Sequence, residues 1–493
     1  MKKTNSLITA NDNVFKIDTP NTTYLFSVTP DGHLTQHYYG KKIKNPLSID
    51  AVTEKIGTGL GTTVFYSDKT APLSLDNMAQ EISTAGKGDF REPYLMLRDP
   101  SGSFVNDFLF DSYEITDGFY PNELPSSHSK ASTLIITTVD KTAKLRLKLY
   151  YSVFRDSDVI VKSSSLTNDG DDEIAIEKIA SSQLDLPECD YSVISFDGAW
   201  AKERYKNERK LSTGIFTIDS KVGYSSNTHN PYVILKKQNA TFDYGDCIGF
   251  NLVYTGNHAE TFEVSVHEKT RIINGINPFG FSWKLSPGET FFTPEATLCY
   301  SADGLNGLTN AYHDFINNHI VRGAWAKKER PVLVNNWEAT GFNFTEEKLL
   351  HIALAGKQVG AELFVLDDGW FGNRTNDSRG LGDWTVNKER FPNELSGFAN
   401  KINEFGMDFG IWVEPEMVNP DSELYRAHPE WAVTHPKYEP STGRNQLLLD
   451  LANIDVQNYI VDSMTDVFSS ANIAYVKWDF NRPMSDFYSP TLG

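Results

Sequence analysis

In roughly the first 300 residues, short runs of alternating apolar and polar positions are separated by clusters of Asn, Asp, Gly and Pro. Such runs lie at residues 23–28, 34–39, 145–150 and 262–267. A period of two predicts strands that bury one face, and Pro30-Asp31-Gly32 between the first two runs predicts a turn. Many short strands of this kind predict a large antiparallel β-sandwich over residues 1–302.

The pattern changes near residue 302. Residues 304–322 space their apolar side chains as a helix does, so we expect a helical linker over residues 303–330. From Pro331 onward, short apolar runs alternate with segments of helical periodicity. Strands are expected at 332–334, 363–366, 409–413 and 473–478, and helices at 346–359, 395–405 and 455–468. This alternation predicts a parallel sheet, and its spacing is typical of a (β/α)8 barrel.

The number of these strands is smaller than a barrel requires. Residues 331–493 contain only four strands of this type, whereas a complete barrel has eight. We therefore expect this segment to be the N-terminal half of a (β/α)8 TIM-type barrel. Its first and last strands would then have open edges, at which other chains can pair.

Composition and charge narrow the function classes. The 493 residues include 46 Lys and Arg against 65 Asp and Glu, a formal charge of −19 that disfavours nucleic acid and anionic lipid as partners. No run approaches about 20 apolar residues, and no apolar segment follows Lys2 and Lys3, so we expect neither a membrane span nor a signal peptide. The three cysteines lack metal or disulfide spacing. We expect a cytoplasmic protein. Its acidic surface suits a neutral substrate such as a sugar, and the alternative is that this surface only maintains solubility.

Aromatic and hydrogen-bonding residues gather at the ends of the four expected strands. The four ends read Asn335-Asn336-Trp337-Glu338, Asp367-Asp368-Gly369-Trp370, Trp412-Val413-Glu414-Pro415-Glu416 and Lys477-Trp478-Asp479-Phe480-Asn481. Barrel enzymes place their chemistry at these carboxyl ends. An indole offers a flat apolar face to the C–H groups of a pyranose, while Asp, Asn and Lys bond its hydroxyls. The strand ends therefore predict a sugar-binding site.

Asp479 is the candidate nucleophile of that site. A carboxylate can attack an anomeric carbon and form a glycosyl-enzyme intermediate. Lys477 and Asn481, two positions away on either side, can keep the carboxylate ionised and bond sugar hydroxyls, because a nearby cation favours the charged form. The alternative is a strand-end Asp that caps a loop.

Other charged residues near the strand ends are candidates for substrate contacts. Asp367 and Asp368 are adjacent acceptors suited to vicinal or primary hydroxyls of a sugar. The alternative for this pair is an Asx-turn before Gly369. Arg444 is either a solvated loop residue or a sugar contact.

Two glutamates, Glu414 and Glu416, flank Pro415. We expect them to be structural or supporting groups, with a role as the catalytic acid as the alternative. A metal site built from Asp367, Asp368 and Glu414 is disfavoured because no His joins them at ligand spacing. We expect no metal and no other cofactor.

Motifs beyond residue 331 resemble the catalytic barrel of glycoside hydrolase family 36, the α-galactosidase (melibiase) family. They are Asn336-Trp337-Glu338-Ala339, Leu366-Asp367-Asp368-Gly369-Trp370-Phe371, Leu381-Gly382-Asp383-Trp384, Trp412-Val413-Glu414-Pro415-Glu416-Met417-Val418 and Lys477-Trp478-Asp479-Phe480-Asn481-Arg482. The segment Gly88-Asp89-Phe90-Arg91-Glu92-Pro93 resembles that family's N-terminal domain. The resemblance covers essentially the whole chain and implies a multidomain protein, with a β-supersandwich over 1–302 and the barrel over 331–493.

The resemblance also implies a function. It implies a retaining α-galactosidase that releases terminal α-galactose from melibiose and raffinose-type oligosaccharides. By the family pattern Asp479 is the nucleophile, and Asp367 and Asp368 bind the O4 and O6 region of galactose. Further implied substrate-binding residues are Arg444, Lys477, Trp478 and Asn481, together with Trp337 and Trp412 lining the pocket. Larger members are commonly tetramers in which the N-terminal domain of one subunit helps form a neighbour's site, so we expect a homo-oligomer.

One element of the family pattern has no match. The family places its acid/base Asp on a later barrel strand, in a Gly-rich segment, whereas the residues after Asp479 offer only Asp486 without that motif. We expect the acid/base to lie beyond Gly493 and this chain alone to be inactive. The alternatives are a non-hydrolytic galactoside-binding or scaffold protein, and a galactosyl transferase of the same family.

Overall fold

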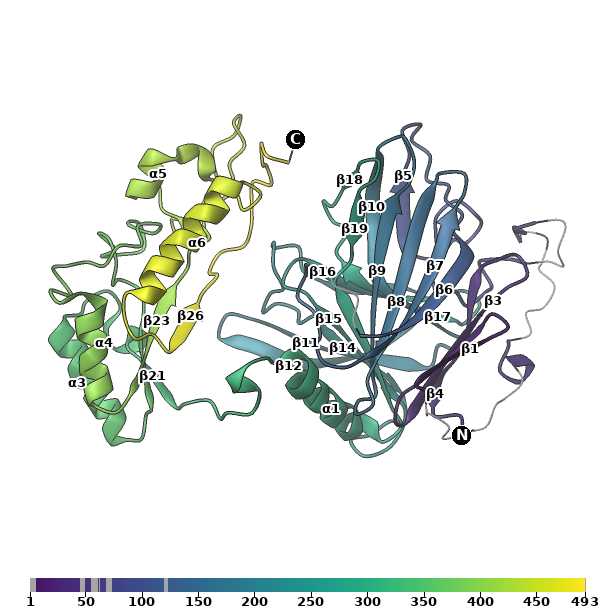
Figure 1. The fold of residues 1–493 in the computed structure, drawn as a ribbon, viewed down its shortest axis with the longest axis horizontal. Helices are drawn as coiled ribbons and strands as arrows, with labels where there is room; N and C mark the ends of the chain where they lie inside the picture. Colours follow the sequence, from purple (N-terminus) through teal and green to yellow (C-terminus); the bar gives the residue numbers. More distant parts are fainter. Residues whose placement is uncertain are drawn as a thin grey trace. The chain divides into compact units, whose positions relative to one another are not determined.

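The chain is described here by a computed structural model that covers residues 6–44, 49–54, 61, 63–67, 73–118 and 123–492. It divides into two compact units, Met1–Lys327 and Lys328–Gly493, which Figure 1 shows in purple to teal and in green to yellow. Each unit has a large hydrophobic core of its own. No helix in the described ranges is long and apolar enough to cross a membrane.

Antiparallel sheets build the first unit (Figure 1). A four-stranded sheet joins, in order, β1 (Ile8–Asn11), β2 (Val14–Asp18), β3 (Thr22–Val28) and β4 (Leu34–Lys41). A six-stranded sheet joins β13 (Gly214–Asp219), β16 (His258–Val264), β17 (Thr270–Ile276), β10 (Ile174–Leu186) and β18 (Trp283–Leu285), with β5 (Leu95–Arg98) paired to β10. A ten-stranded sheet joins β12 (Lys202–Lys210), β11 (Tyr191–Ala199), β14 (Tyr232–Lys237), β15 (Cys247–Val253), β20 (Glu295–Ser301), β9 (Val159–Asn168), β8 (Leu145–Val153), β7 (Ser132–Asp140) and β6 (Leu109–Asp117), with β19 (Thr290–Phe292) paired to β9.

The run at 145–149 buries one face of its strand, as its period predicts, whereas the run at 23–28 has residues 23–27 buried on both faces. In β8, Leu145, Leu147 and Leu149 are buried, while Arg146 and Lys148 between them stay partly exposed. These leucines join one core that also contains apolar residues of β3, β7, β9 and β17. Removing this apolar area from water is the main driving force for folding the unit.

One run, 262–267, is a strand only in part. β16 ends at Val264, and the Glu268 N–H donates to the Ser265 carbonyl at 3.1 Å in the turn that follows. β17 then begins at Thr270 and pairs back onto β16. The prediction that the strand extends to His267 was wrong, because the alternation continues through Val266, an apolar residue that is exposed in the turn.

The segment expected to be a helical linker packs on the first unit. Its helix, α1 (Gly304–Phe315), continues into the π-helical turn η2 (Ile316–Ile320) and precedes the short turn η3 (Ala324–Ala326). Leu308 and Tyr312 are buried in a cluster with residues of β15 and β20. The Tyr312 hydroxyl donates to the Gly249 carbonyl at 2.9 Å, which fixes the helix to the ten-stranded sheet.

The second unit contains a parallel sheet whose strands alternate with helices. The strand order is β21 (Leu333–Asn335), β22 (Leu363–Leu366), β23 (Asp408–Val413) and β26 (Tyr475–Trp478). The connecting helices are α3 (Glu346–Gln358), α4 (Glu394–Glu404) and α6 (Ile454–Ser469). Shorter elements lie in the loops: α2 (Trp337–Thr340), β24 (Met417–Val418), α5 (Glu423–Ala427), η4 (Pro429–Trp431) and β25 (Leu447–Leu448). These bounds closely match the expected alternation of strands and helices.

Local sequence sets the starts of these helices. Thr345 Oγ1 accepts the Lys348 N–H at 3.3 Å at the start of α3, and Asn453 Oδ1 accepts the Asp455 N–H at 2.9 Å at the start of α6. Each side chain satisfies a backbone donor that the first helical turn leaves unpaired. The buried stripe of α6 consists of Val456, Ile460, Met464 and Val467. Its spacing of three to four residues matches a helix with one apolar face on a core.

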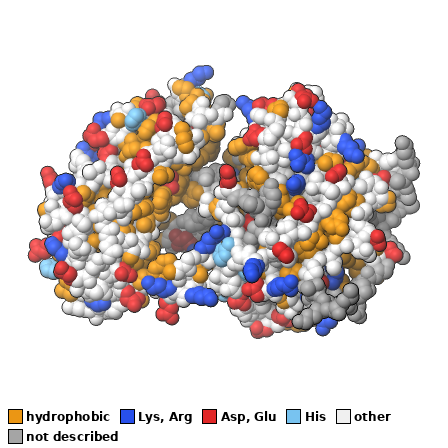
Figure 2. All heavy atoms as spheres, in the orientation of Figure 1, with side chains coloured by type: hydrophobic (Ala, Val, Ile, Leu, Met, Phe, Trp, Pro, Cys, Tyr) orange, Lys and Arg blue, Asp and Glu red, His pale blue; other side chains and the backbone are white. Residues whose placement is uncertain are grey.

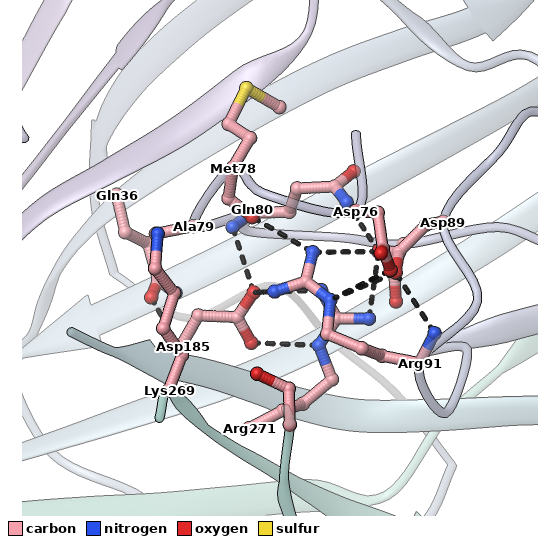
Figure 3. A network of polar contacts seen from close by, with 12 residues as sticks. Gln36, Asp76, Met78, Ala79, Gln80, Asp89, Arg91, Asp185, Lys269 and Arg271 are labelled. Atoms are coloured by element: carbon pink, nitrogen blue, oxygen red, sulfur yellow. Dashed lines mark hydrogen bonds and ion pairs between the residues drawn. The ribbon is translucent and has the colours of Figure 1, made fainter. Parts of the chain in front are cut away.

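The segment Gly88–Pro93 contributes to a buried ionic network in the first unit (Figure 3). Arg271 of β17 donates to the two oxygens of Asp185 of β10 at 2.8 and 2.7 Å, and pairs with Asp89 at 2.9 Å. Arg91 donates to Asp89 at 2.9 Å. Burial acts to raise the pKa of Asp185, but the two guanidinium groups outweigh it and the pKa is lowered. The network therefore ties this loop to the six-stranded sheet.

On the visible face, charged side chains do not gather in one patch. Figure 2 shows acidic and basic side chains interspersed on the visible face of both units. An interspersed surface of this kind gives little long-range steering of a charged ligand.

Candidate functional site

Parallel pairing brings the strand-end residues of the second unit to one edge of the sheet. Asn335 lies opposite Val365, and Leu366 lies opposite Ile411. At the last pair of strands, Val413 lies opposite Trp478, and the Asp479 N–H donates to the Val413 carbonyl at 2.8 Å. The residues that directly follow the four strands are thus neighbours, and they are Asn336, Asp367, Glu414 and Asp479.

Asp367 is the centre of one polar cluster at this edge. Its Oδ2 accepts hydrogen bonds from Lys477 Nζ at 2.8 Å and from the amide of Asn335. Its Oδ1 accepts the Asp368 N–H at 2.9 Å, and its own N–H donates to Asn336 Oδ1 at 2.8 Å. The Asp367 side chain is 4% exposed and that of Lys477 is 37% exposed. The cluster therefore combines a buried, oriented anion with a cation that solvent or a ligand can reach.

Asp368 is held by a buried arginine. Arg374 donates to its two oxygens, from Nε at 3.0 Å and from Nη2 at 2.8 Å, and donates from Nη1 to Asn419 Oδ1 at 2.8 Å. Burial raises the pKa of Asp368, and the Arg374 guanidinium offsets this only in part. Gly369 follows with φ of 102°, in the left-handed region that favours glycine, and a Cβ there would lie 3.0 Å from Arg390 Nη1.

Asp479 presents one fixed and one open carboxylate oxygen. Its Oδ2 accepts hydrogen bonds from the Trp412 indole N–H at 3.0 Å and from Asn481 Nδ2 at 2.7 Å. Within the described part of the chain, Oδ1 accepts no hydrogen bond. Donors on one oxygen orient the group, while the second oxygen remains able to form a bond.

A layer of aromatic side chains fixes the direction of the Trp412 indole. Trp412 is 2% exposed and stacks on Phe371 with 6° between the ring planes. Trp384 packs against Phe371 at a centroid distance of 4.5 Å, and the Trp370 indole donates to the Trp412 carbonyl at 2.9 Å. Because the rings are closely packed, the hydrogen bond from Trp412 to Asp479 has little freedom to move.

Glu414 is buried beside Asp479. It is 1% exposed, its Oε1 accepts the Asn481 N–H at 2.6 Å, and Gln446 Nε2 is 3.4 Å from Oε2. Burial raises the pKa of Glu414 to about 7, with the Asp479 carboxylate adding to the effect and the Asn481 N–H opposing it. A glutamate in this state changes its charge near neutral pH.

Three expected substrate-binding residues have other partners or places. The Trp478 indole N–H donates to Glu416 at 2.9 Å, and the residue is 49% exposed. Arg444 forms an ion pair with Asp377 at 3.5 Å. Trp337 is partly buried at the start of α2. Their contact with a sugar remains a prediction.

The second unit has a pocket of about 520 Å³ that lies apart from this cluster. Its lining includes Asp383 and Tyr459 but none of the strand-end carboxylates. Asp383 accepts the N–H groups of Glu423 and Leu424 at 3.1 and 3.0 Å, so the motif Leu381–Trp384 helps to fix the start of α5. Among the described residues, no group of three or more His, Cys, Asp or Glu side chains is placed to hold a metal ion.

Comparison with known protein families accounts for both units. The glycosyl hydrolase family 36 N-terminal domain matches residues 32–286, and the Melibiase family matches residues 290–493. The chain belongs to glycoside hydrolase family 36. The resemblance based on the sequence motifs is confirmed.

Individual family 36 relatives align along nearly the whole chain. Alpha-galactosidase AgaA of Geobacillus stearothermophilus is 40% identical over 474 residues, which cover 95% of this chain and 65% of that protein. The crystal structure of the alpha-galactosidase AgaB from the same organism aligns with a TM-score of 0.94 and 39% identity, covering 99% of this chain and 68% of that one. An AgaA variant crystallised with raffinose gives 0.94 and 39%, covering 97% and 67%. The chain thus spans about 65% of the length of the curated AgaA.

The sequence did not reveal the contacts of several of these residues. Arg374 lies in the long loop after β22, outside every motif. Its nearness to Asp368 in the sequence was the one sign of their hydrogen bonds. Asn335 was noted at a strand end, but its hydrogen bond to Asp367 was not predicted. Glu414 was expected to be a supporting group, and its closeness to Asp479 depends on the pairing of β23 with β26. That pairing joins segments far apart in the chain.

Proposed function

We propose that this chain carries the sugar-cleaving site of a retaining α-galactosidase, with Asp479 as the nucleophile. The observation that carries the proposal is the asymmetric Asp479 carboxylate, with Oδ2 held by Trp412 and Asn481 and Oδ1 open within the described part of the chain. A nucleophile needs a fixed direction and an unblocked atom. Membership of family 36 supports the same reaction class.

The proposed substrates are terminal α-galactosides such as melibiose and raffinose-type oligosaccharides. Relatives were crystallised with raffinose and with stachyose, which supports this class. The buried acceptors Asp367 and Asp368 suit the O4 and O6 hydroxyls, and the partly exposed Lys477 suits a neighbouring oxygen. Arg444, Trp478, Asn481, Trp337 and Trp412 are proposed to complete the sugar contacts.

The proposed reaction has two displacements. Asp479 Oδ1 attacks the anomeric carbon as the bond to the leaving oxygen breaks, giving a galactosyl ester of Asp479 with inverted configuration. Water then attacks the same carbon, loses a proton to solvent, releases the carboxylate and inverts the configuration again, so that the product retains it. Protonation of the leaving oxygen needs a general acid, and we assign none among the described residues. Glu414 does not suit that role, because it is 1% exposed and bonded to Asn481.

We further infer that β21, β22, β23 and β26 are four strands of a (β/α)8 barrel. Their parallel order and the helix that follows each of the first three support this inference. In that fold, active sites lie at the carboxyl ends of the strands. The Asp367 and Asp479 clusters occupy those ends.

The test uses a substrate whose leaving group departs without protonation. Fluoride release from α-D-galactopyranosyl fluoride reports attack by the nucleophile whether or not a general acid is present. We expect release by the parent chain and its loss in Asp479→Ala. Azide should restore turnover in Asp479→Ala and give β-galactosyl azide, because azide replaces the nucleophile and inverts the configuration once. A retained α-azide would show that Asp479 is not the nucleophile.

Two controls define the outcome. Asp466→Asn changes an exposed carboxylate of α6 and should leave fluoride release unchanged. Binding of 1-deoxygalactonojirimycin, a ligand found in a crystal structure of AgaA, separates recognition from chemistry. Binding by the parent with no fluoride release would favour a non-hydrolytic galactoside-binding protein over the proposed enzyme.

A further inference from the structure

Asn481 lies in the loop after β26 and contacts Asp479 directly. The position of this loop therefore affects the Asp479 carboxylate. Asn481 Nδ2 donates to Asp479 Oδ2 at 2.7 Å. The backbone N–H of Asn481 donates in turn to Glu414 Oε1 at 2.6 Å. Glu414 follows β23, and β23 pairs with β26, so the contact joins two neighbouring strand ends.

We propose that Glu414 is a positioning residue for the nucleophile. Its carboxylate anchors the backbone of Asn481, and this anchor directs the Asn481 amide at Asp479 Oδ2. The inference rests on the proposed function, in which Asp479 is the attacking group. In this proposal Glu414, which is 1% exposed, acts through Asn481 and not by contact with the sugar.

The surroundings of Glu414 show that it is costly to keep there. It is 1% exposed, and Gln446 Nε2 lies at the long distance of 3.4 Å from its Oε2. A buried carboxylate with few donors is unfavourable, and burial accordingly raises its pKa to about 7. The charges that act on it come from other elements: Asp479 and Asp368 at strand ends, and Arg444 in the loop before β25.

A residue needed only to fill this space would not have to be acidic. Glutamine has the same reach and also offers an oxygen to the Asn481 N–H. The side-chain oxygen of the buried Gln446 accepts no hydrogen bond from the described residues. It is therefore available to accept one from an uncharged amide or a protonated acid at position 414. The geometry therefore assigns the Oε1 contact with Asn481, and not bulk or charge, as the functional feature of Glu414.

The first test reads the position of Asp479 without using activity. The Trp412 indole N–H donates to Asp479 Oδ2 at 3.0 Å, so its resonance in a ¹H–¹⁵N spectrum of ¹⁵N-tryptophan-labelled chain reports any movement of that oxygen. Trp412→Phe identifies the signal among the nine tryptophans. We expect Glu414→Ala to shift this signal and Glu414→Gln to leave it nearly unchanged. An unshifted signal in Glu414→Ala would overturn the proposal, whatever the activity of the chain.

The second test is kinetic and uses galactosyl fluoride. Glu414→Ala should lower kcat by about 100-fold with little change in KM, since misplaced catalytic groups lose rates of this order. Glu414→Gln should stay within about tenfold of the parent, because it restores the acceptor. In a double-mutant cycle with Asn481→Ala, the second substitution should add little, since both act on one contact. Multiplicative losses would contradict a shared route.

Folding and the parent reaction are checked separately. Thermal unfolding of each variant shows whether a loss of rate reflects a loss of structure, and Glu414→Asp, which shortens the reach, replaces the alanine variant if that variant does not fold. If fluoride release by the parent does not depend on Asp479, the proposed function fails. The Trp412 signal still decides in that case whether Glu414 positions the carboxylate.

Discussion

The two units each bury a cluster of charged residues, and the clusters differ in how completely their acceptors are used. In the first unit, both oxygens of Asp185 accept from Arg271, and Asp89 accepts from Arg91 (Figure 3). In the second unit, Asp479 has one bonded and one open oxygen within the described residues. Asp368, whose two oxygens both accept from Arg374, resembles Asp185 in this respect. The open oxygen of Asp479 has capacity for a ligand.

The pKa shifts follow the same division. Burial acts to raise the pKa of both Asp185 and Glu414, but only Asp185 has guanidinium groups that reverse the effect. Asp185 therefore remains charged and stabilising, whereas Glu414, with its pKa near 7, is destabilising once it ionises. Sites that retain such unfavourable groups are candidates for function.

The largest effect is expected from breaking the saturated cluster. Arg271→Met should lower the free energy of unfolding of the first unit by about 3–5 kcal/mol, because it leaves the guanidinium of Arg91 to compensate two buried carboxylates, Asp185 and Asp89. Denaturant unfolding with limited proteolysis assigns the loss to the first unit. Arg146→Met removes an exposed ion pair with Asp169 and should cost about 1 kcal/mol or less. Equal losses in the two variants would contradict the role of burial.

Breaking the open cluster should affect activity more than stability. Lys477→Met removes the cation paired with Asp367, and we expect kcat/KM for galactosyl fluoride to fall by about 100-fold, the usual loss of one well-placed donor. Unfolding should change less than in Arg271→Met, since the Lys477 side chain is 37% exposed and Asp367 keeps its hydrogen bonds from the Asn335 amide and the Asp368 N–H. Lys388→Met, which removes an exposed lysine paired with Glu394, is the matched control and should retain activity. A large loss of stability in Lys477→Met would place this cluster with the structural one.

The open cluster was largely predictable from sequence because its residues directly follow apolar strands. The runs that became β22 and β23 end at Leu366 and Val413, so the position of Asp367 could be inferred from periodicity alone. The saturated cluster was recognised only as a family-like segment. Its partners Asp185 and Arg271 lie on different strands, and their meeting depends on the register of β10 with β17.

Details that depend on side-chain direction were also beyond the sequence. Trp412 and Trp478 both lie at strand ends and both were expected to contact the sugar. In the structure, the Trp412 indole donates to Asp479 and the Trp478 indole donates to Glu416. Trp412 lies opposite Lys477 in the pairing of β23 with β26, so Trp478, one residue after Lys477, points to the other face of the sheet. The pattern of apolar residues does not reveal which face holds the carboxylate.

Glu414→Gln should change the pH dependence of stability. The folded-state pKa of Glu414, about 7, lies above its ordinary value of 4.5, so the parent loses stability as the pH rises from about 4.5 to 7. Gln does not titrate, and the variant should gain about 3 kcal/mol relative to the parent between pH 4.5 and pH 8. Chemical unfolding at the two pH values measures this gain. A gain of the same size at both values would show that the raised pKa has no part in it.

The smallest effect is expected from a matched pair of tryptophan substitutions, each of which keeps an aromatic ring and removes one N–H. Trp412→Phe removes a donor to the nucleophile and should lower kcat by about tenfold, since a hydrogen bond to a charged group contributes about 1.5–3 kcal/mol. Trp478→Phe removes a half-exposed hydrogen bond to Glu416 and should change kcat by less than about twofold, because solvent replaces that partner. Fluoride release under saturating substrate measures both. If Trp478→Phe lowered kcat more than Trp412→Phe does, the reactive face of β26 would be the one that carries Trp478. Asp479 would then not be the open acceptor of the site.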